Sequence, residues 1–189
     1  MKGFFSNLDW RLFLVAPLAM VIIAIAFAPQ RDIYLIKGVP ELMALVLTGA
    51  AVAVSGFRLK IEDNPLVPLM FAFCLAFFSR EIHFTGTSTG VYIAVLAIGI
   101  WAWRWRGRIA VSVNTGYFKS CLFATGWAYF LALLVQRRFF KHVLPEPLLV
   151  WEHSIHVPME EWLEVVAHVL LLITVFSGFS GLLKKRDQE

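Results

Sequence analysis

The chain has 189 residues, of which 59% are hydrophobic and 16% are charged, and its formal net charge is +4 at pH 7. With a mean hydropathy of +0.73, this composition excludes an ordinary water-soluble domain and a disordered chain, both of which are more polar. The positive charge requires no nucleic-acid partner, because basic residues at one face of a membrane protein account for it. We therefore expect a protein whose principal partner is the lipid bilayer.

Six apolar runs follow one another along the chain, each close to the roughly 20 residues that a helix needs to cross a bilayer. They occupy about residues 11–29, 40–57, 65–84, 90–106, 117–136 and 160–182. Few residues remain outside these runs. The sequence therefore predicts an all-α integral membrane protein, a compact bundle of six transmembrane helices that forms a single transmembrane domain over residues 1–189.

Basic residues gather on one side of this predicted bundle. The side with both termini and the second and fourth loops carries Lys2, Arg11, Arg58, Lys60, Arg104, Arg106, Arg108, Lys119, Lys184, Lys185 and Arg186. The opposite side carries Arg31, Lys37, Arg80, Arg137, Arg138 and Lys141. The positive-inside rule then predicts that both termini are cytoplasmic, in agreement with an even number of helices. The expected location is the plasma membrane, which is the inner membrane in a bacterium.

Small residues recur at four-residue spacing in the fifth run, at Ala124, Ala128 and Ala132. This spacing lets helix backbones approach closely in lipid. The stripe indicates tight packing within the bundle, although it suits a homo-oligomer or a partner membrane subunit equally well. Cys74 and Cys121 lie inside apolar runs, so we expect buried free thiols at both positions.

The segment 137–159 is the longest expected loop, and it contains Pro145, Pro147 and Pro158. A proline biases the residue before it toward extended backbone, away from a helix. Two interpretations stay open for this segment: a lid across the outer mouth of the bundle, or an unstructured connector.

The last run carries the most informative polar pattern. Glu160, Glu161, Glu164 and His168 fall within an arc of roughly 100° around a helix. His168 would lie about 10 Å deeper than Glu161 at a rise of roughly 1.5 Å per residue. Below His168 the same face is apolar. Because ionisable groups at membrane depth are costly, we expect a functional pocket that opens outward and ends within the membrane.

Carboxylate and imidazole side chains in this pocket are ligands suited to a divalent metal such as zinc, iron or manganese. The candidate metal ligands are Glu160, Glu164, His168, His153 and His156. The chain lacks the Glu-x-x-His motif of di-metal helical bundles, so residue types alone indicate a metal and the cofactor stays unknown. Without a metal, Glu164 and His168 would be the catalytic acid and base.

The end of the third run adds Arg80, Glu81 and His83 as candidate substrate-binding residues. Neighbours in sequence do not face each other on a helix, so Arg80 should pair with Glu160 or Glu164 instead of Glu81. The pair could serve only to lock two helices together. Alternatively, the forked guanidinium of Arg80 could hold a phosphate or another anionic head group.

Three functional hypotheses follow from this pattern. The first is a small membrane enzyme that acts on a lipid or lipid-linked substrate from the outer leaflet. The second is a non-enzymatic membrane subunit or assembly factor, in which the Arg/Glu/His cluster is structural. The third is a proton- or ion-coupled transporter, although the inner halves of the runs carry few polar groups and no inverted repeat is visible.

Overall fold

The computed structural model describes residues 8–27, 38–82, 87–113, 116–142 and 146–186, excepting the side chains of 87–89, 110–113, 116, 142, 146–154 and 178–186. Its elements are η1 (Trp10–Leu14), α1 (Val15–Phe27), α2 (Val39–Ile61), α3 (Leu66–Glu81), α4 (Thr87–Arg104), α5 (Arg106–Val113), α6 (Gly116–Gln136), η3 (Phe139–His142) and α7 (Glu146–Arg186). Every regular element in these ranges is helical, so the all-α prediction is confirmed.

Three helical segments in the described part of the chain are long and apolar enough to cross a membrane: Trp10–Phe27, Val39–Ile61 and Tyr117–Gln136. Gly90–Arg104 is a shorter apolar helix. Many large apolar side chains on these segments point outward, such as Ile22 at 65% and Leu96 at 65% exposure. In water such a surface would be an aggregation liability, whereas lipid is its natural surrounding. These features are compatible with an integral membrane protein.

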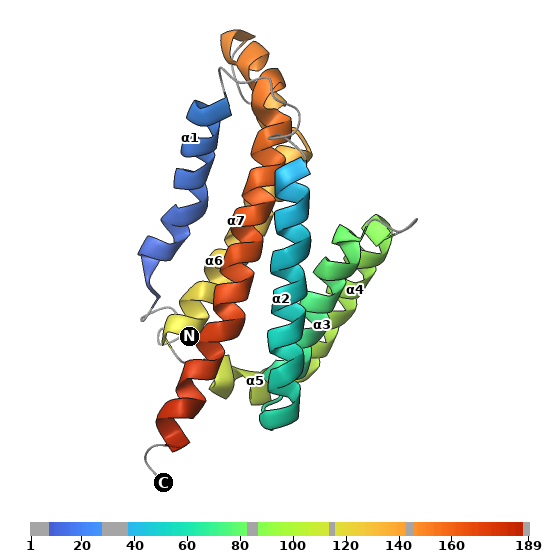
Figure 1. Ribbon diagram of the computed structural model, residues 1–189, viewed down its shortest axis with the longest axis vertical. Helices are drawn as coiled ribbons and strands as arrows, with labels where there is room; N and C mark the ends of the chain where they lie inside the picture. The colour runs from blue at the N-terminus through green and yellow to red at the C-terminus, as the bar shows by residue number, and fades with distance from the viewer. Residues whose placement is uncertain (1–7, 28–37, 83–86, 114–115, 143–145, 187–189) are drawn as a thin grey trace.

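Helix α7 is the axis of the bundle (Figure 1). It packs against α6, α2 and α1, while α3 packs on α2 and α4 packs on α3 at the periphery. The short α5 lies at the same end of the bundle as the C-terminal end of α7 (Figure 1). Because α7 touches three other helices, polar groups on its faces lie where several elements can supply partners.

The small-residue stripe on α6 is a packing face, as its spacing predicted. Ala124, Ala128 and Ala132 are at most 2% exposed, and they belong to one core cluster with Leu163 and Ala167 of α7. Without bulky side chains on α6, the two backbones approach closely and gain dispersion contacts. The predicted buried free cysteines, Cys74 and Cys121, are also confirmed.

The expected loop over 137–159 is wrong for most of its length, because the described backbone over 146–159 is helical. Helix α7 begins at Glu146 and continues through Pro158 to Arg186, so the connector from α6 is short. Pro147 lies in the first turn, where its missing N–H is not needed. Pro158 lacks a helical hydrogen bond, at a cost of about 3 kcal/mol. Burial of Ile155 and Met159 in the core opposes that cost.

The other predicted boundaries shift by a few residues, with one exception. The sequence predicted a helix over 90–106 and a loop after it, whereas α4 ends at Arg104 and α5 forms a separate helix over Arg106–Val113. The two helices meet at a turn at Trp105, whose N–H still bonds to the carbonyl of Trp101. Arg106 and Arg108 lie in the first turn of α5, and basic residues of this kind are common at a membrane surface.

Candidate functional site

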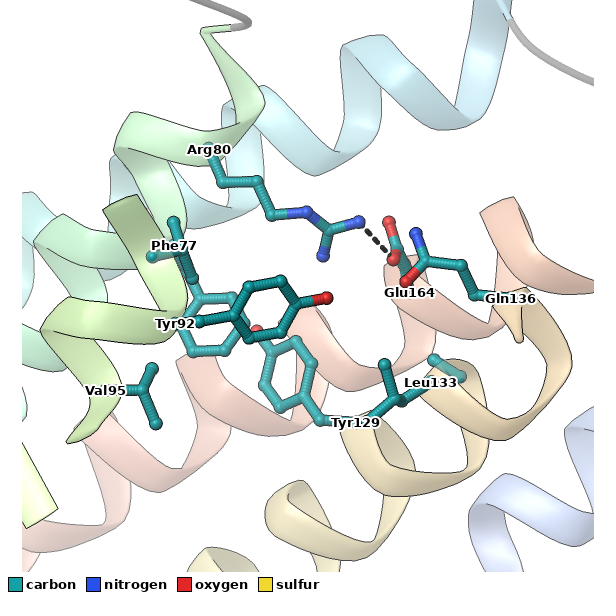
Figure 2. A pocket seen from close by; sticks show the side chains of 10 residues that line it. Phe77, Arg80, Tyr92, Val95, Tyr129, Leu133, Gln136 and Glu164 are labelled. Carbon is teal, nitrogen blue, oxygen red and sulfur yellow. Dashed lines mark hydrogen bonds and ion pairs between the residues drawn. The ribbon is translucent and has the colours of Figure 1, made fainter. Parts of the chain in front are cut away.

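A pocket of about 270 Å³ lies where α3, α4, α6 and α7 come together (Figure 2). Its lining residues are Phe77, Arg80, Val91, Tyr92, Val95, Tyr129, Ala132, Leu133, Gln136 and Glu164. Polar atoms gather toward one end, where the guanidinium of Arg80 lies between the hydroxyl of Tyr92 and the carboxylate of Glu164 (Figure 2). The remaining wall is mostly apolar. This division is typical of a site for a molecule with a polar head and an apolar body.

Arg80 and Glu164 form an ion pair across the pocket. Arg80 Nη2 donates to Glu164 Oε1 at 2.5 Å, and the two side chains are 26% and 12% exposed. The pair joins the last turn of α3 to α7, as predicted from the sequence. Partial burial strengthens the attraction between the charges, but it also removes water from both groups. The pair is therefore worth less than its Coulomb energy, and losing one member leaves a poorly solvated charge.

Behind the pocket wall, His168 links a tyrosine to a carboxylate. Its imidazole is fully buried, with Nδ1 2.6 Å from the hydroxyl of Tyr129 and Nε2 3.5 Å from Glu81 Oε1. A proton on Nε2 would face the carboxylate, which leaves Nδ1 to accept a hydrogen bond from the Tyr129 hydroxyl. Nε2 makes no hydrogen bond with any described residue. The result is a carboxylate–imidazole–phenol chain whose phenol ring reaches the pocket.

Aromatic packing fixes the geometry of this chain. The ring of Phe77 stacks on Tyr129, with centroids 4.2 Å apart and an interplanar angle of 29°. His168 lies edge-on to Tyr129 at 5.6 Å and to Phe77 at 6.4 Å. Offset and edge-on arrangements are the favoured geometries of aromatic pairs. They fix the orientation of the phenol relative to the imidazole without adding charge.

The structure separates the predicted site residues into two layers. Arg80 and Glu164 line the pocket, whereas His168 and Glu81 lie behind Tyr129. His168 was expected to face the pocket directly as the acid or base. That expectation needs correction, because the imidazole is completely enclosed and reaches the pocket only through the phenol of Tyr129. The third member of the predicted substrate-binding set, His83, lies outside the described residues.

The predicted metal ligands do not assemble into a metal site in the part of the chain that the structure describes. No three His, Cys, Asp or Glu side chains there gather closely enough to hold an ion. The helical course of α7 explains this result, because His156, Glu160, Glu164 and His168 follow one another at four-residue intervals. Two neighbours at that spacing can share an ion, but the four side chains together extend over about 18 Å of the helix and cannot all converge on one ion. The side chain of His153 lies outside the described residues.

Between His168 and Ser177, the described inner face of α7 is mostly apolar, and its polar side chains are the hydroxyls of Thr174 and Ser177. Leu171 and Val175 are fully buried, as the sequence suggested. However, the hydroxyl of Thr174 lies 2.9 Å from that of Thr125 on α6. Each hydroxyl also lies within hydrogen-bond distance of the carbonyl four residues earlier in its own helix, so one hydroxyl donates to the other, and the second donates to its own carbonyl. These hydroxyls join α6 to α7 and largely satisfy each other within the core.

A second buried charge pair lies farther toward the end of the bundle that holds α5. Arg58 Nε and Nη2 donate to the two carboxylate oxygens of Glu62 at 2.5 and 2.8 Å, and Nη1 donates to the carbonyl of Val175 at 2.6 Å. The two charged side chains are only 4% and 2% exposed. The two-pronged geometry is the strongest arrangement of an Arg–carboxylate pair. It fixes the C-terminal end of α2 to α7.

Three polar residues of the pocket were not singled out from the sequence: Tyr129, Tyr92 and Gln136. Tyr129 carried a signal that could have found it. Its hydroxyl falls inside an apolar run, directly after the small residue Ala128, and a hydroxyl at membrane depth needs a partner. Tyr92 and Gln136 lie near the ends of their runs, where polar residues are ordinary, so their positions alone do not indicate a site.

No family model, curated protein or solved structure matches this chain. The chemistry open to the site follows from its own groups. Arg80 can hold or stabilise negative charge, Glu164 can accept or donate a proton, and Tyr129 can pass its proton to His168. Those are the components of general acid–base chemistry beside an electrostatic stabiliser.

Proposed function

We propose that this chain is a small membrane-embedded enzyme that acts on a lipid or lipid-linked substrate by acid–base chemistry. The observation that carries the proposal is the buried chain in which Tyr129 is hydrogen-bonded to His168 and His168 Nε2 faces Glu81 Oε1 at 3.5 Å, beside a pocket bearing Arg80 and Glu164. Buried imidazoles that only fill space need no carboxylate behind them. A carboxylate–imidazole pair behind a hydroxyl is the arrangement that activates hydroxyl groups in unrelated enzymes.

The proposed proton transfers conserve charge at each step. Tyr129 accepts a proton from the substrate as it passes its own proton to Nδ1 of His168. The imidazolium that forms faces Glu81 across 3.5 Å, which offsets its positive charge. The negative charge that develops on the substrate lies beside Arg80, while Glu164 supplies or accepts a second proton at the pocket. Positioned proton transfer of this kind contributes about 10²–10⁴-fold to a rate.

The proposed membrane arrangement has six transmembrane helices, with both termini in the cytoplasm of a plasma membrane. The asymmetry of Lys and Arg supports this orientation. The location of the arginine-bearing α5 and the C-terminal end of α7 at one end of the bundle supports it as well (Figure 1). Single cysteines at Arg108 and Lys141, introduced after both native cysteines are replaced, test it. An impermeant thiol reagent applied to intact cells should label only the cysteine at position 141. Labelling of the cysteine at position 108 alone would show that the orientation is the opposite one.

Product formation in a defined bilayer tests the enzymatic proposal. Purified protein would be placed in nanodiscs of mixed phospholipids, and new lipid species would be followed by mass spectrometry alongside the protein's metal content. We expect a product that falls at least about 100-fold with Glu164→Gln or Tyr129→Phe. Tyr117→Phe is the matched control, because Tyr117 is 58% exposed and lies outside the pocket. A product that forms equally in all variants would remove these residues from the reaction.

The second candidate is a non-enzymatic membrane subunit, and the Arg80–Glu164 pair favours it because the pair closes on itself between two helices. The exchange of both residues, Arg80→Glu with Glu164→Arg, separates the two functions. A purely structural pair should tolerate the exchange, and cells should keep the function of the protein. An enzyme should lose activity by the same exchange even when the protein folds, because the charges presented to the substrate have traded places.

A further inference from the structure

The pocket has a side opening that faces the surroundings of the bundle. Tyr92 and Val95 on α4 and Leu133 on α6 line it while being 51%, 36% and 37% exposed. Helix α4 packs on α3, and the wall formed by α6 stands across the pocket from it. In a membrane, these exposed apolar side chains contact lipid chains. A ligand can therefore enter sideways from the bilayer, with its apolar part trailing between α4 and α6.

The polar end of the pocket has hydrogen-bond donors to offer. A guanidinium carries five N–H groups, and among the described residues Arg80 donates only to Glu164. The side-chain amide of Gln136, beside Glu164 in Figure 2, makes no hydrogen bond with a described residue. The hydroxyl of Tyr92 points toward the same place (Figure 2). Donors that converge from three helices on one end of a cavity are suited to an acceptor-rich, negatively charged group.

The volume limits what enters. The 270 Å³ of the pocket correspond to about nine water molecules at roughly 30 Å³ each. This space holds a carboxylate or a phosphate together with a few methylene groups. The rest of a long chain must leave through the side opening. Two acyl chains on one glycerol backbone would both have to leave through the same side opening, so we expect a single chain to bind more tightly.

We propose that the pocket binds the anionic head of a single-chain amphiphile, a carboxylate or a phosphomonoester, on Arg80 and Gln136, with its chain leaving between α4 and α6. This inference names the substrate class of the proposed enzyme and takes its catalytic meaning from that proposal. The binding itself stands on the charge, the volume and the side opening of the pocket.

Binding of an anion to this pocket should change the protonation of the protein, because it changes the balance of charge around Arg80. The ionisable groups around the bound head are Arg80 and Glu81 on α3, Tyr92 on α4, Tyr129 on α6, and Glu164 and His168 on α7. The ion pair is already neutral, so an added anion replaces Glu164 as the partner of Arg80. A displaced carboxylate beside an anion in a poorly solvated pocket is costly unless it is protonated. Binding should therefore take up about one proton from solution, and Glu164→Gln should abolish that uptake.

Calorimetry on the full-length protein in mild detergent tests this inference with defined probes. The probes are oleate, oleoyl lysophosphatidate, oleyl alcohol, dioleoyl phosphatidate and inorganic phosphate. We expect at least one of the first two to bind tenfold or more tightly than oleyl alcohol and than dioleoyl phosphatidate, and inorganic phosphate not to bind detectably. The comparison of oleate with the lysophosphatidate distinguishes a carboxylate head from a phosphate head.

Variants assign the contacts. Arg80→Gln should remove the preference for the anion over the alcohol, whereas Arg106→Gln, at an exposed arginine outside the pocket, should preserve it. Val95→Trp, which leaves the ion pair intact, should block the side opening and weaken every chain-bearing probe at least tenfold. If Arg80→Gln does not fold, Val95→Trp still tests the inference.

Three results would overturn the inference: equal binding of oleate, lysophosphatidate and oleyl alcohol, unchanged binding in Val95→Trp, or equally tight binding of dioleoyl phosphatidate. Failure of the enzymatic proposal is a separate observation. If the protein binds anions but forms no product in the nanodisc assay, the enzymatic proposal fails. If it forms a product but shows no preference for anions, only the proposed binding of an anionic single-chain amphiphile fails.

Discussion

Neutralising Glu164 should destabilise the protein by more than a surface substitution does and by less than a fully buried ion pair would imply. Removing one member of a fully buried pair costs about 3–5 kcal/mol, whereas an exposed pair contributes about 0–1 kcal/mol. Arg80 is 26% exposed and Glu164 is 12% exposed, which places this pair between the two limits. Glu164→Gln keeps an acceptor oxygen for Arg80, so we expect a loss of about 1–2 kcal/mol in the free energy of unfolding.

A double-mutant cycle isolates the interaction from the separate effects of each side chain. Arg80→Gln and Glu164→Gln are combined, and the unfolding free energy of each protein is measured in mixed micelles with increasing denaturing detergent. Since the double variant leaves no unpaired charge, it should cost less than the sum of the single variants, with a coupling of about 1 kcal/mol. Asp63→Asn, at an exposed position after α2, is the control and should stay within about 0.5 kcal/mol of the parent.

The reasoning fails if the two single substitutions add without coupling, or if Glu164→Gln is as silent as Asp63→Asn. Either result would mean that solvent or lipid head groups screen Arg80 as well as Glu164 does. The pocket would then be wetter than the burial of Glu164 indicates. A stabilising effect of Glu164→Gln would point to a carboxylate kept for function at the expense of the fold.

Three further substitutions test the packing and the hydrogen bonds by the same unfolding measurement. Tyr129→Phe strips the buried imidazole of its hydrogen bond and should cost about 1–3 kcal/mol; no loss would mean that another donor replaces the hydroxyl. Arg58→Lys keeps the charge but loses the forked geometry and the bond to the α7 carbonyl, and should cost about 1–3 kcal/mol, whereas Arg106→Lys at an exposed site should be nearly silent. Gly56→Leu drives a side chain into an aromatic ring that an added Cβ would already approach to 3.2 Å, at a cost of about 1–3 kcal/mol. Gly126→Leu is its control because an added Cβ there meets nothing within 4 Å, and equal losses would contradict the packing of α2 on α3.

Helical periodicity predicted where several side chains of the candidate site lie, and their roles stay predictions. The spacing of Glu164 and His168 placed both on the inner face of α7, and the end of an apolar run placed Arg80 within reach of a carboxylate on that helix. Both inferences depend on local geometry and on the cost of an unpaired charge at membrane depth. Those two constraints act within a single helix, so a sequence without relatives is enough to apply them.

The errors arose where tertiary contacts decide the outcome. The prolines at 147 and 158 favoured a loop, but the burial of Ile155 and Met159 keeps the backbone helical through Pro158. The depth of His168 was predicted, yet whether it faced the pocket or stood behind Tyr129 depends on how α6 is rotated against α7. That rotation follows from the packing of the alanine stripe, which a list of polar residues does not contain.

Helix α7 spans Glu146–Arg186, which is 41 residues. At 1.5 Å per residue such a helix is about 60 Å long, roughly twice the 30 Å thickness of a bilayer's hydrocarbon core. Even a strongly tilted helix of this length reaches well past the head groups. Pro158 lies between the overhanging N-terminal part and the stretch that carries Glu164 and His168, at the kind of position where helices bend. In the proposed six-helix arrangement this N-terminal part of α7 extends outside the membrane, so a force applied to it would reach Glu164 and His168 through the backbone of a single helix.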